Sequence, residues 1–181
     1  ARHFTGVISN AQLTGAYSGP VTFSNPSNNF SGSFTGNGAG LTNLNAWQLG
    51  GNAGTAPGVN FLGTTDNQPL EFRVNQQRTL RLEPNTGGAP NVIAGAAVNF
   101  VGPGVHGATI SGGGATNVFG QAFTNRVAAN LATVSGGADN AADEIFSTVG
   151  GGRANRANGI SALVAGGWYN TASGGAATVG G

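Results

Sequence analysis

Residues 132–142 read Ala-Thr-Val-Ser-Gly-Gly-Ala-Asp-Asn-Ala-Ala, and this stretch decides the fold because it recurs at a fixed step. Related stretches begin at Ser147 and Ala162, and a fourth begins at Ala177 and is cut after Gly181. The central valines stand fifteen residues apart, at Val134, Val149, Val164 and Val179. A fixed period of this kind indicates a stack of repeated structural units. The cut after Gly181 fits either a piece of a longer chain or a stack that a further subunit continues.

The residues of each copy predict two short strands joined by two turns. Alternation along Ala-Thr-Val places alanine and valine on one face of a strand and threonine on the other. The Gly-Gly pair that follows permits the positive φ angles of a tight reversal. An asparagine keeps the same step (Asn140, Asn155 and Asn170), and we expect it to bond neighbouring backbone and to form a ladder with its copies. One such coil buries little by itself, so its stability must come from stacking on the next coil.

Two weaker copies precede the regular ones. Residues 108–117 form a copy with one extra residue, and residues 91–99 form a degenerate copy. The central residues Ile93, Ile110 and Val134 are 17 and 24 residues apart instead of fifteen. We therefore expect an insertion around residues 119–129.

The composition of the chain excludes several other classes of protein. Of its 181 residues 34 are glycine and only 7% are charged, with a net charge of +1, so no basic face for nucleic acid is expected. Cysteine is absent, which excludes a disulfide scaffold and thiolate metal sites. No apolar run reaches the length of a membrane-spanning helix. Glycine, asparagine, serine and threonine are poor residues for helix interiors, so the 39% of hydrophobic residues are expected to pack in an all-β fold.

The repeat units resemble the head-domain repeats of trimeric autotransporter adhesins, the YadA-like family. The resemblance covers residues 91–181 and is most specific in Ser-Thr-Val-Gly-Gly-Gly-Arg-Ala-Asn (147–155) and in residues 170–181. It implies a left-handed parallel β-roll in which three chains pack their inner faces around one axis. The trimer core that it implies is formed by the repeated valines, Val134, Val149, Val164 and Val179.

The first half of the chain predicts two further segments. Phenylalanine alternates there with small polar residues, and residues 30–85 resemble bacterial "tail fibre domain-containing" surface proteins, in which such a segment sits above a fibrous shaft. We expect a β-prism-like shaft or assembly segment, rich in glycine, asparagine and phenylalanine, over residues 1–46. A β-hairpin collar is expected over residues 47–90, followed by the β-roll over residues 91–181.

The collar is predicted from the alternation in residues 70–74 and 79–83. We expect these stretches to pair as a hairpin with one buried apolar face, formed by Leu70, Phe72, Val74, Leu80 and Leu82. The charged residues between them would lie outward and form ion pairs across the strands or between chains.

No group of residues predicts catalysis. A glycine loop at 36–40 lacks the helix that would complete a phosphate site. The sister coils replace Asp139 by alanine and tyrosine, which excludes a repeating calcium ladder. Asp143 and its neighbouring glutamate would face opposite ways in a strand, so they cannot act as a glycosidase pair. His3 and His106 lie far apart, without an acid or nucleophile at motif spacing. We expect no catalytic residue, no cofactor, no metal ion and no enzymatic activity.

The candidate surface contact is the pair Trp168 and Tyr169, which follows the Gly-Gly turn of its coil. Sister coils place Arg-Ala (153–154) and Ala-Asp (138–139) at this point. Aromatic side chains on the outer rim of a fibre are a candidate contact for a glycan or a receptor. The alternative, which the pattern favours, is packing against an adjacent chain or subunit.

Together these features predict the non-enzymatic structural subunit of an extracellular or cell-surface fibre, with adhesion as its role. The expected partners are two further copies of the chain in a homotrimer, end-to-end neighbours in a polymer, and an unknown host receptor such as a glycan. Nucleic acid and a membrane span are not expected. The alternative is the tail fibre of a phage or an injection system, carried on a virion. A monomeric ice-binding solenoid is a weaker alternative, because its threonine column is single and is broken by leucine at Thr133, Thr148, Leu163 and Thr178.

Overall fold

A computed structural model of the chain describes residues 24, 26–27, 31 and 46–181. The chain divides into two compact units, Ala1–Gln48 and Leu49–Gly181. The predicted shaft over residues 1–46 lies almost entirely outside the described residues. All the described strands lie in the second unit, and the residues that the structure describes contain no helix.

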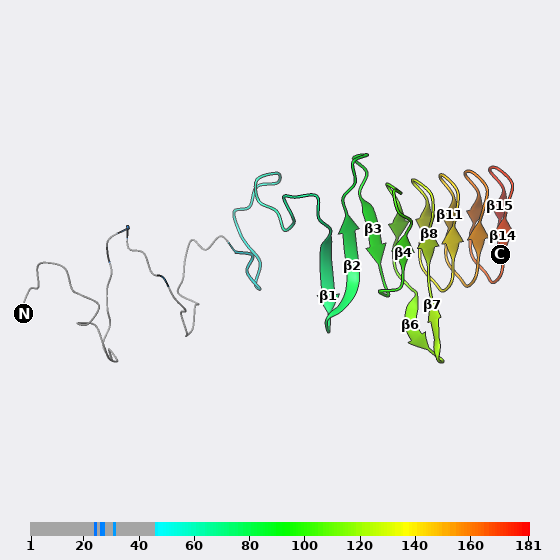
Figure 1. Cartoon of the computed structure of the whole chain (residues 1–181), viewed down its shortest axis with the longest axis horizontal. Helices are drawn as coiled ribbons and strands as arrows, with labels where there is room; N and C mark the ends of the chain where they lie inside the picture. The colour runs from blue at the N-terminus through cyan, green and yellow to red at the C-terminus, as the bar shows by residue number, and fades with distance from the viewer. Residues whose placement is uncertain (1–23, 25, 28–30, 32–45) are drawn as a thin grey trace, which may run out of the picture. The chain divides into compact units, whose positions relative to one another are not determined.

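The second unit is a β-solenoid whose coils each add one strand to each of two parallel sheets (Figure 1). Sheet A contains β3 (Asn91–Ala94), β5 (Thr109–Ile110), β9 (Thr133–Val134), β11 (Thr148–Val149), β13 (Leu163–Val164) and β15 (Thr178–Val179). Sheet B contains β4 (Phe100–Val101), β8 (Arg126–Val127), β10 (Ala141–Ala142), β12 (Arg156–Ala157) and β14 (Thr171–Ala172). The all-β prediction and the prediction of two strands in each coil are confirmed.

The register of sheet A fixes the length of a regular coil. Thr133 pairs in parallel with Thr148, which pairs with Leu163, and Leu163 pairs with Thr178. Each partner lies fifteen residues further along the chain, so the predicted period is confirmed. Short strands of two residues suffice because those inside the stack pair with a neighbour on both sides.

The core of the solenoid lies between the two sheets of one chain. Val134, Val149 and Val164 point inward from sheet A and are completely buried, whereas Val179, in the last strand, is partly exposed. Small alanines of sheet B face them, at Ala142, Ala157 and Ala172. One coil therefore covers its own valine. The three inner valines keep no free surface for a second chain, so any contact between chains would have to use other residues.

A ladder of buried asparagines runs through the turns between sheet A and sheet B. The Oδ1 atom of Asn125 accepts the backbone N–H of Asn140 at 3.1 Å, and Oδ1 of Asn140 accepts the N–H of Asn155 at 3.0 Å. The ladder begins at Asn99 and ends at Asn170 with the same geometry. The side-chain amide groups donate to glycine carbonyls of their own and of the next coil, as from Asn140 to Gly136 and Gly152. The predicted asparagine ladder is confirmed.

The insertion lies earlier in the sequence than predicted. It is the antiparallel hairpin β6 (Ala115–Val118) and β7 (Gln121–Phe123), whose Phe-Gly turn has positive φ at both central residues, as two-residue hairpin turns require. The expectation of an insertion around residues 119–129 is therefore wrong for its second half. Asn125 is the rung of the ladder in this coil, and residues 126–127 form strand β8.

The predicted collar hairpin forms and continues the solenoid. Strands β1 (Leu70–Val74) and β2 (Gln77–Glu83) are antiparallel, and β2 also pairs with β3, so the collar and the roll belong to one unit. Glu71 forms ion pairs with Arg73 at 2.6 Å and with Arg81 across the hairpin at 3.5 Å. The hydrogen bond from Arg73 holds the pKa of Glu71 below its usual value.

The apolar face of this hairpin is less covered than the sequence predicts. Leu70, Leu80 and Leu82 are partly buried, but Phe72 and Val74 remain exposed. A register shift between Phe72 and Arg73 interrupts the alternation at this point. Since a β-bulge bends the strand that carries it, the tip of the hairpin leaves the packed face.

Candidate ligand-binding surface

The turns that lead from sheet A to sheet B place one line of side chains along the solenoid axis. Isolated parallel bridges join Ala138 to Arg153 and Arg153 to Trp168, so these residues occupy the same position in successive coils. Phe123 lies one coil earlier, at the end of hairpin strand β7 and two residues before Asn125, while Gly114 fills the position of Ala138 in that coil. We call Phe123, Arg153, Trp168 and the adjacent Tyr169 the aromatic rim.

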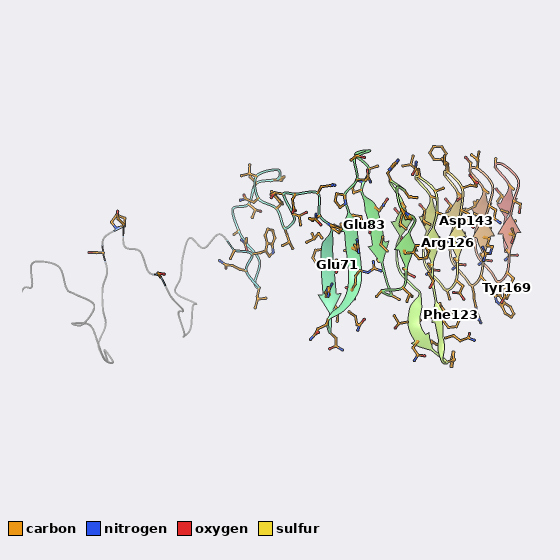
Figure 2. The ribbon with its side chains drawn as sticks, viewed as in Figure 1. Glu71, Glu83, Phe123, Arg126, Asp143 and Tyr169 are labelled. Carbon is orange, nitrogen blue, oxygen red and sulfur yellow. The ribbon has the colours of Figure 1, made fainter. Side chains whose placement is uncertain are left out.

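The members of the aromatic rim contact one another across the coils. The guanidinium carbon of Arg153 lies 5.0 Å from the ring centroid of Phe123 and 6.0 Å from that of Trp168. The Trp168 and Tyr169 rings have centroids 5.1 Å apart and are tilted by 45°. An arginine stacked between aromatic rings is an attractive cation–π arrangement that also limits the motion of its guanidinium. Figure 2 shows Phe123 and Tyr169 on the same edge of the solenoid.

The two aromatic side chains that the sequence singled out are largely exposed. Trp168 is 64% exposed and Tyr169 is 68% exposed. Tyr169 has a φ of 56°, in the left-handed region, and the same strained position holds Asp139 and Ala154 in the sister coils. A tyrosine tolerates this conformation less well than aspartate does. The turn therefore presents Tyr169 to solvent at some cost in backbone energy.

A shallow hollow of about 440 Å³ lies beside the rim on the outer face of sheet B. Its floor is formed by small residues, Ala141 and Ala154, and Tyr169 lines one side. Arg126 and Arg156 stand on either side of Ala141 because they are its register partners in the two neighbouring strands. Phe100, Thr124, Asp139 and Asn140 complete the lining.

The two arginines of this hollow share one carboxylate. Arg126 donates to Asp143 at 2.5 Å, and Arg156 lies 3.9 Å from the other oxygen of Asp143 (Figure 2 labels the closer pair). Among the described residues, Arg156 forms no ion pair other than this 3.9 Å contact with Asp143. Asp139 accepts the backbone N–H of Thr124 at 2.7 Å, which ties the hairpin insertion to the next coil. Asp139 in the lining and Asp143, which pairs with both arginines from beside the hollow, leave this part of the surface close to neutral.

The opposite turns, which lead from sheet B back to sheet A, carry a second line of exposed side chains. Leu131, Ile145, Phe146 and Ile160 are each between 40% and 57% exposed. Backbone hydrogen bonds between successive turns hold them in line, from Phe146 to Asn130 at 3.3 Å and from Ser161 to Ile145 at 2.9 Å. We call these four residues the apolar ridge.

Sequence reasoning identified Trp168 and Tyr169 but missed the arginines and Phe123 that lie with them. The fifteen-residue step from Arg153 to Trp168 and the thirty-residue step from Arg126 to Arg156 are signals that an alignment of the coils contains. Phe123 was hidden because the hairpin displaced it from the common register.

The described residues that were weighed as catalytic or metal-binding candidates have structural contacts and do not gather into one site. The backbone N–H of His106 donates to Oδ1 of Asn130 at 3.0 Å, and Asp143 forms ion pairs with Arg126 and Arg156. His3 and the glycine loop at 36–40 lie outside the described residues. Across residues 46–181 no group of three or more histidine and acidic side chains gathers into a metal-binding cluster. The described residues also form no helix with the length and apolar character to span a membrane.

Comparisons with known proteins return no relative for this chain. No protein-family model, no curated protein and no solved structure matches it.

Proposed function

We propose that this β-solenoid repeat protein is the non-enzymatic structural subunit of an extracellular fibre, built from three parallel copies, in which the aromatic rim provides adhesion. The repeat pattern supports a structural role. The residues shared by the regular coils are those of the core, the turns and the asparagine ladder, whereas the outward side chains differ from coil to coil.

The observation that carries the trimer is the apolar ridge. It runs along the solenoid axis because its members follow the coil repeat, and it exposes several large apolar side chains in a continuous line. Exposed apolar patches of this kind commonly mark sites of protein association. A cyclic three-fold assembly brings the same surface of every copy to its axis, so a straight ridge is the shape that three parallel copies need.

The ridge also replaces the interface that the repeated valines were expected to form. Val134, Val149 and Val164 complete the core of a single chain. A trimer of such chains would then join three folded solenoids along their ridges instead of sharing one hydrophobic core. Exposed Leu163, on the neighbouring outer face of sheet A, would extend the contact.

The native mass of the full chain in solution tests this proposal. Light scattering is expected to give about three times the 17.8 kDa of one chain, or a polymer of such units. Ile160→Asp places a charge on the ridge and should reduce the mass to that of one chain while the β-sheet circular dichroism is retained. Asn158→Asp adds the same charge at an exposed position near the ridge and should leave the trimer intact. A folded wild-type monomer at micromolar concentration would overturn the proposal.

A further inference from the structure

The aromatic rim has the dimensions of an extended ligand. From Phe123 to Trp168 it covers three coil steps, which amount to about 14 Å at the usual spacing of neighbouring strands. The short side chain of Ala138 interrupts the line between Phe123 and Arg153. A second shallow hollow, of about 310 Å³, opens there and is lined by Val118 and Phe119 of the hairpin. Hollows thus border the line of rings on both sides.

The two exposed aromatic side chains of the rim add little to the stability of the fold. Sister coils place alanine at both positions, Ala138 for Trp168 and Ala154 for Tyr169, and they fold with the same turn. The coil therefore does not need aromatic side chains for its own structure. Leaving most of two large apolar side chains in water forgoes the stabilisation that their burial would provide. Exposed aromatic side chains that the fold does not require are typical of binding surfaces.

The polar groups beside the rings are numerous but nearly balanced in charge. Asp139 lines the hollow with Arg126 and Arg156, and Asp143 pairs with both of these arginines. Arg153 lies between the Phe123 and Trp168 rings, so three arginines stand beside two aspartates. Planar guanidinium and carboxylate groups make paired hydrogen bonds with neighbouring donors and acceptors. A single-stranded nucleic acid would require a clearly positive groove, and a polyanion would meet the two aspartates. The balance favours an uncharged ligand that is rich in hydroxyl groups.

We propose that the aromatic rim and the hollow beside it bind a linear, uncharged oligosaccharide that lies along the solenoid axis. A pyranose ring has apolar C–H faces and a hydroxyl-bearing edge, so it can stack on Trp168 and Tyr169 while its edge bonds to Arg156 and Asp139. Phe123 and Arg153 would contact the sugars further along the chain, and the rim of about 14 Å accommodates about three sugar units. This inference rests on the adhesive role proposed above and names the class of its ligand.

The test uses cellohexaose and chitohexaose as probes. The chain has two tryptophans, so Trp47→Phe leaves the fluorescence of Trp168 alone as a reporter. Either hexasaccharide is expected to shift or quench this emission in a saturable manner. Calorimetric titration of the full chain should then show at least tenfold weaker binding for Trp168→Ala and for Tyr169→Ala. Both variants should fold, because the sister coils already carry alanine at these positions.

The matched control is Phe61→Ala. Phe61 is an aromatic side chain of comparable exposure that lies before the β1–β2 hairpin, and its loss should leave binding unchanged. No binding of either hexasaccharide by the folded protein would overturn the inference. Binding of polygalacturonate or of oligo(dT) alone would overturn it in favour of a polyanion or a nucleic acid.

The same variants separate this inference from the trimer. If Trp168→Ala lowers the native mass, the rim is an interface between copies and the saccharide site is refuted. If Ile160→Asp yields monomers that still bind cellohexaose, the saccharide site stands by itself. If the trimer forms but no saccharide binds, the fibre proposal survives and its ligand class is wrong.

Discussion

Asparagine is the residue on which the regularity of this solenoid depends. A buried amide can accept one hydrogen bond at its oxygen and donate two from its nitrogen, and Asn140 and Asn155 make all three. No other side chain of this size combines two N–H donors with an acceptor oxygen without charge. Each rung joins two coils, so the ladder fixes the register of the stack at a place where the backbone turns and cannot pair as a strand.

Replacement of Asn140 by alanine is therefore expected to destabilise the fold. The N–H of Asn155 and the carbonyl of Gly136 lose their partners inside the protein, and each unsatisfied buried group costs about 1–3 kcal/mol. We expect the free energy of unfolding in urea to fall by about 2–4 kcal/mol. Asn170→Ala removes a single side-chain bond, to Gly166, and should cost about 1 kcal/mol. Equal losses for the two variants would contradict the ladder.

The paired glycines differ in how strictly they are required. Gly152 has a φ of 82°, and a Cβ atom there would overlap the carbonyl oxygen of Gly167 in the next coil. Gly166 has no heavy atom within 4 Å of such a Cβ, and its φ lies outside the left-handed region.

Alanine substitutions of these two glycines test that difference. Gly152→Ala should lower the melting temperature markedly, since the strained backbone alone costs about 1–2 kcal/mol and the overlap adds to it. Gly166→Ala should leave the melting temperature unchanged or raise it slightly. Thermal unfolding followed by circular dichroism measures both, and a tolerated Gly152→Ala would mean that neighbouring coils lie further apart than described.

Among the elements, the hairpin β6–β7 is an addition to a coil that is otherwise complete. The N–H of Gly114 donates to Gly137 at 2.8 Å, just as that of Ala138 donates to Gly152 at 2.9 Å. Gly114 thus corresponds to Ala138 of the next coil, and Thr124, which precedes the ladder residue Asn125, corresponds to Asp139. The sequence between them is nine residues long, which is the difference between this coil and a regular one.

Deletion of residues 115–123 is expected to leave the solenoid folded. The joined coil has fifteen residues, and its main cost is the left-handed φ that Thr124 would have to adopt, about 1–2 kcal/mol. Circular dichroism and the native mass should remain those of the intact chain, whereas cellohexaose binding should weaken because Phe123 is lost. A deletion of equal length inside a regular coil, residues 138–146, removes β10 and should prevent folding. Unfolding of both deletions would show that the hairpin is part of the scaffold.

The sequence predicted the regular coils well because their residues have one structural solution each. In residues 132–181 the constant step of the valines, the Gly-Gly reversal and the spaced asparagine all predict the same coil of two strands and two turns. The hairpin was misplaced because Asn117 imitates the ladder position after its glycines, while the true rung, Asn125, follows eight residues later. Local pattern alone does not reveal which of two asparagines reaches the stack.

At the scale of the whole molecule, the sequence left open which chain covers the valines. An Ala-Thr-Val strand shows one apolar face but not what lies against it, and a neighbouring copy was the expected answer. The structure closes each coil on itself, since Ala142 follows Val134 by eight residues and faces it from the other sheet. The two arginines of the hollow escaped prediction for a related reason. Arg126 and Arg156 are thirty residues apart in the sequence, but they flank Ala141 in neighbouring strands of sheet B.

The direction of the hydrogen bonds between coils determines how the molecule responds to tension. These bonds run along the solenoid axis, so a pull on Leu49 and Gly181 opens them one coil at a time instead of shearing a whole sheet at once. A released coil of fifteen residues lengthens the chain by about 45 Å. An optical trap should record a series of equal steps of this size, with one longer step for the coil that carries the hairpin. A tether of this design would absorb work under flow and shorten again as its coils re-form, so that a pulled attachment yields gradually before it is lost.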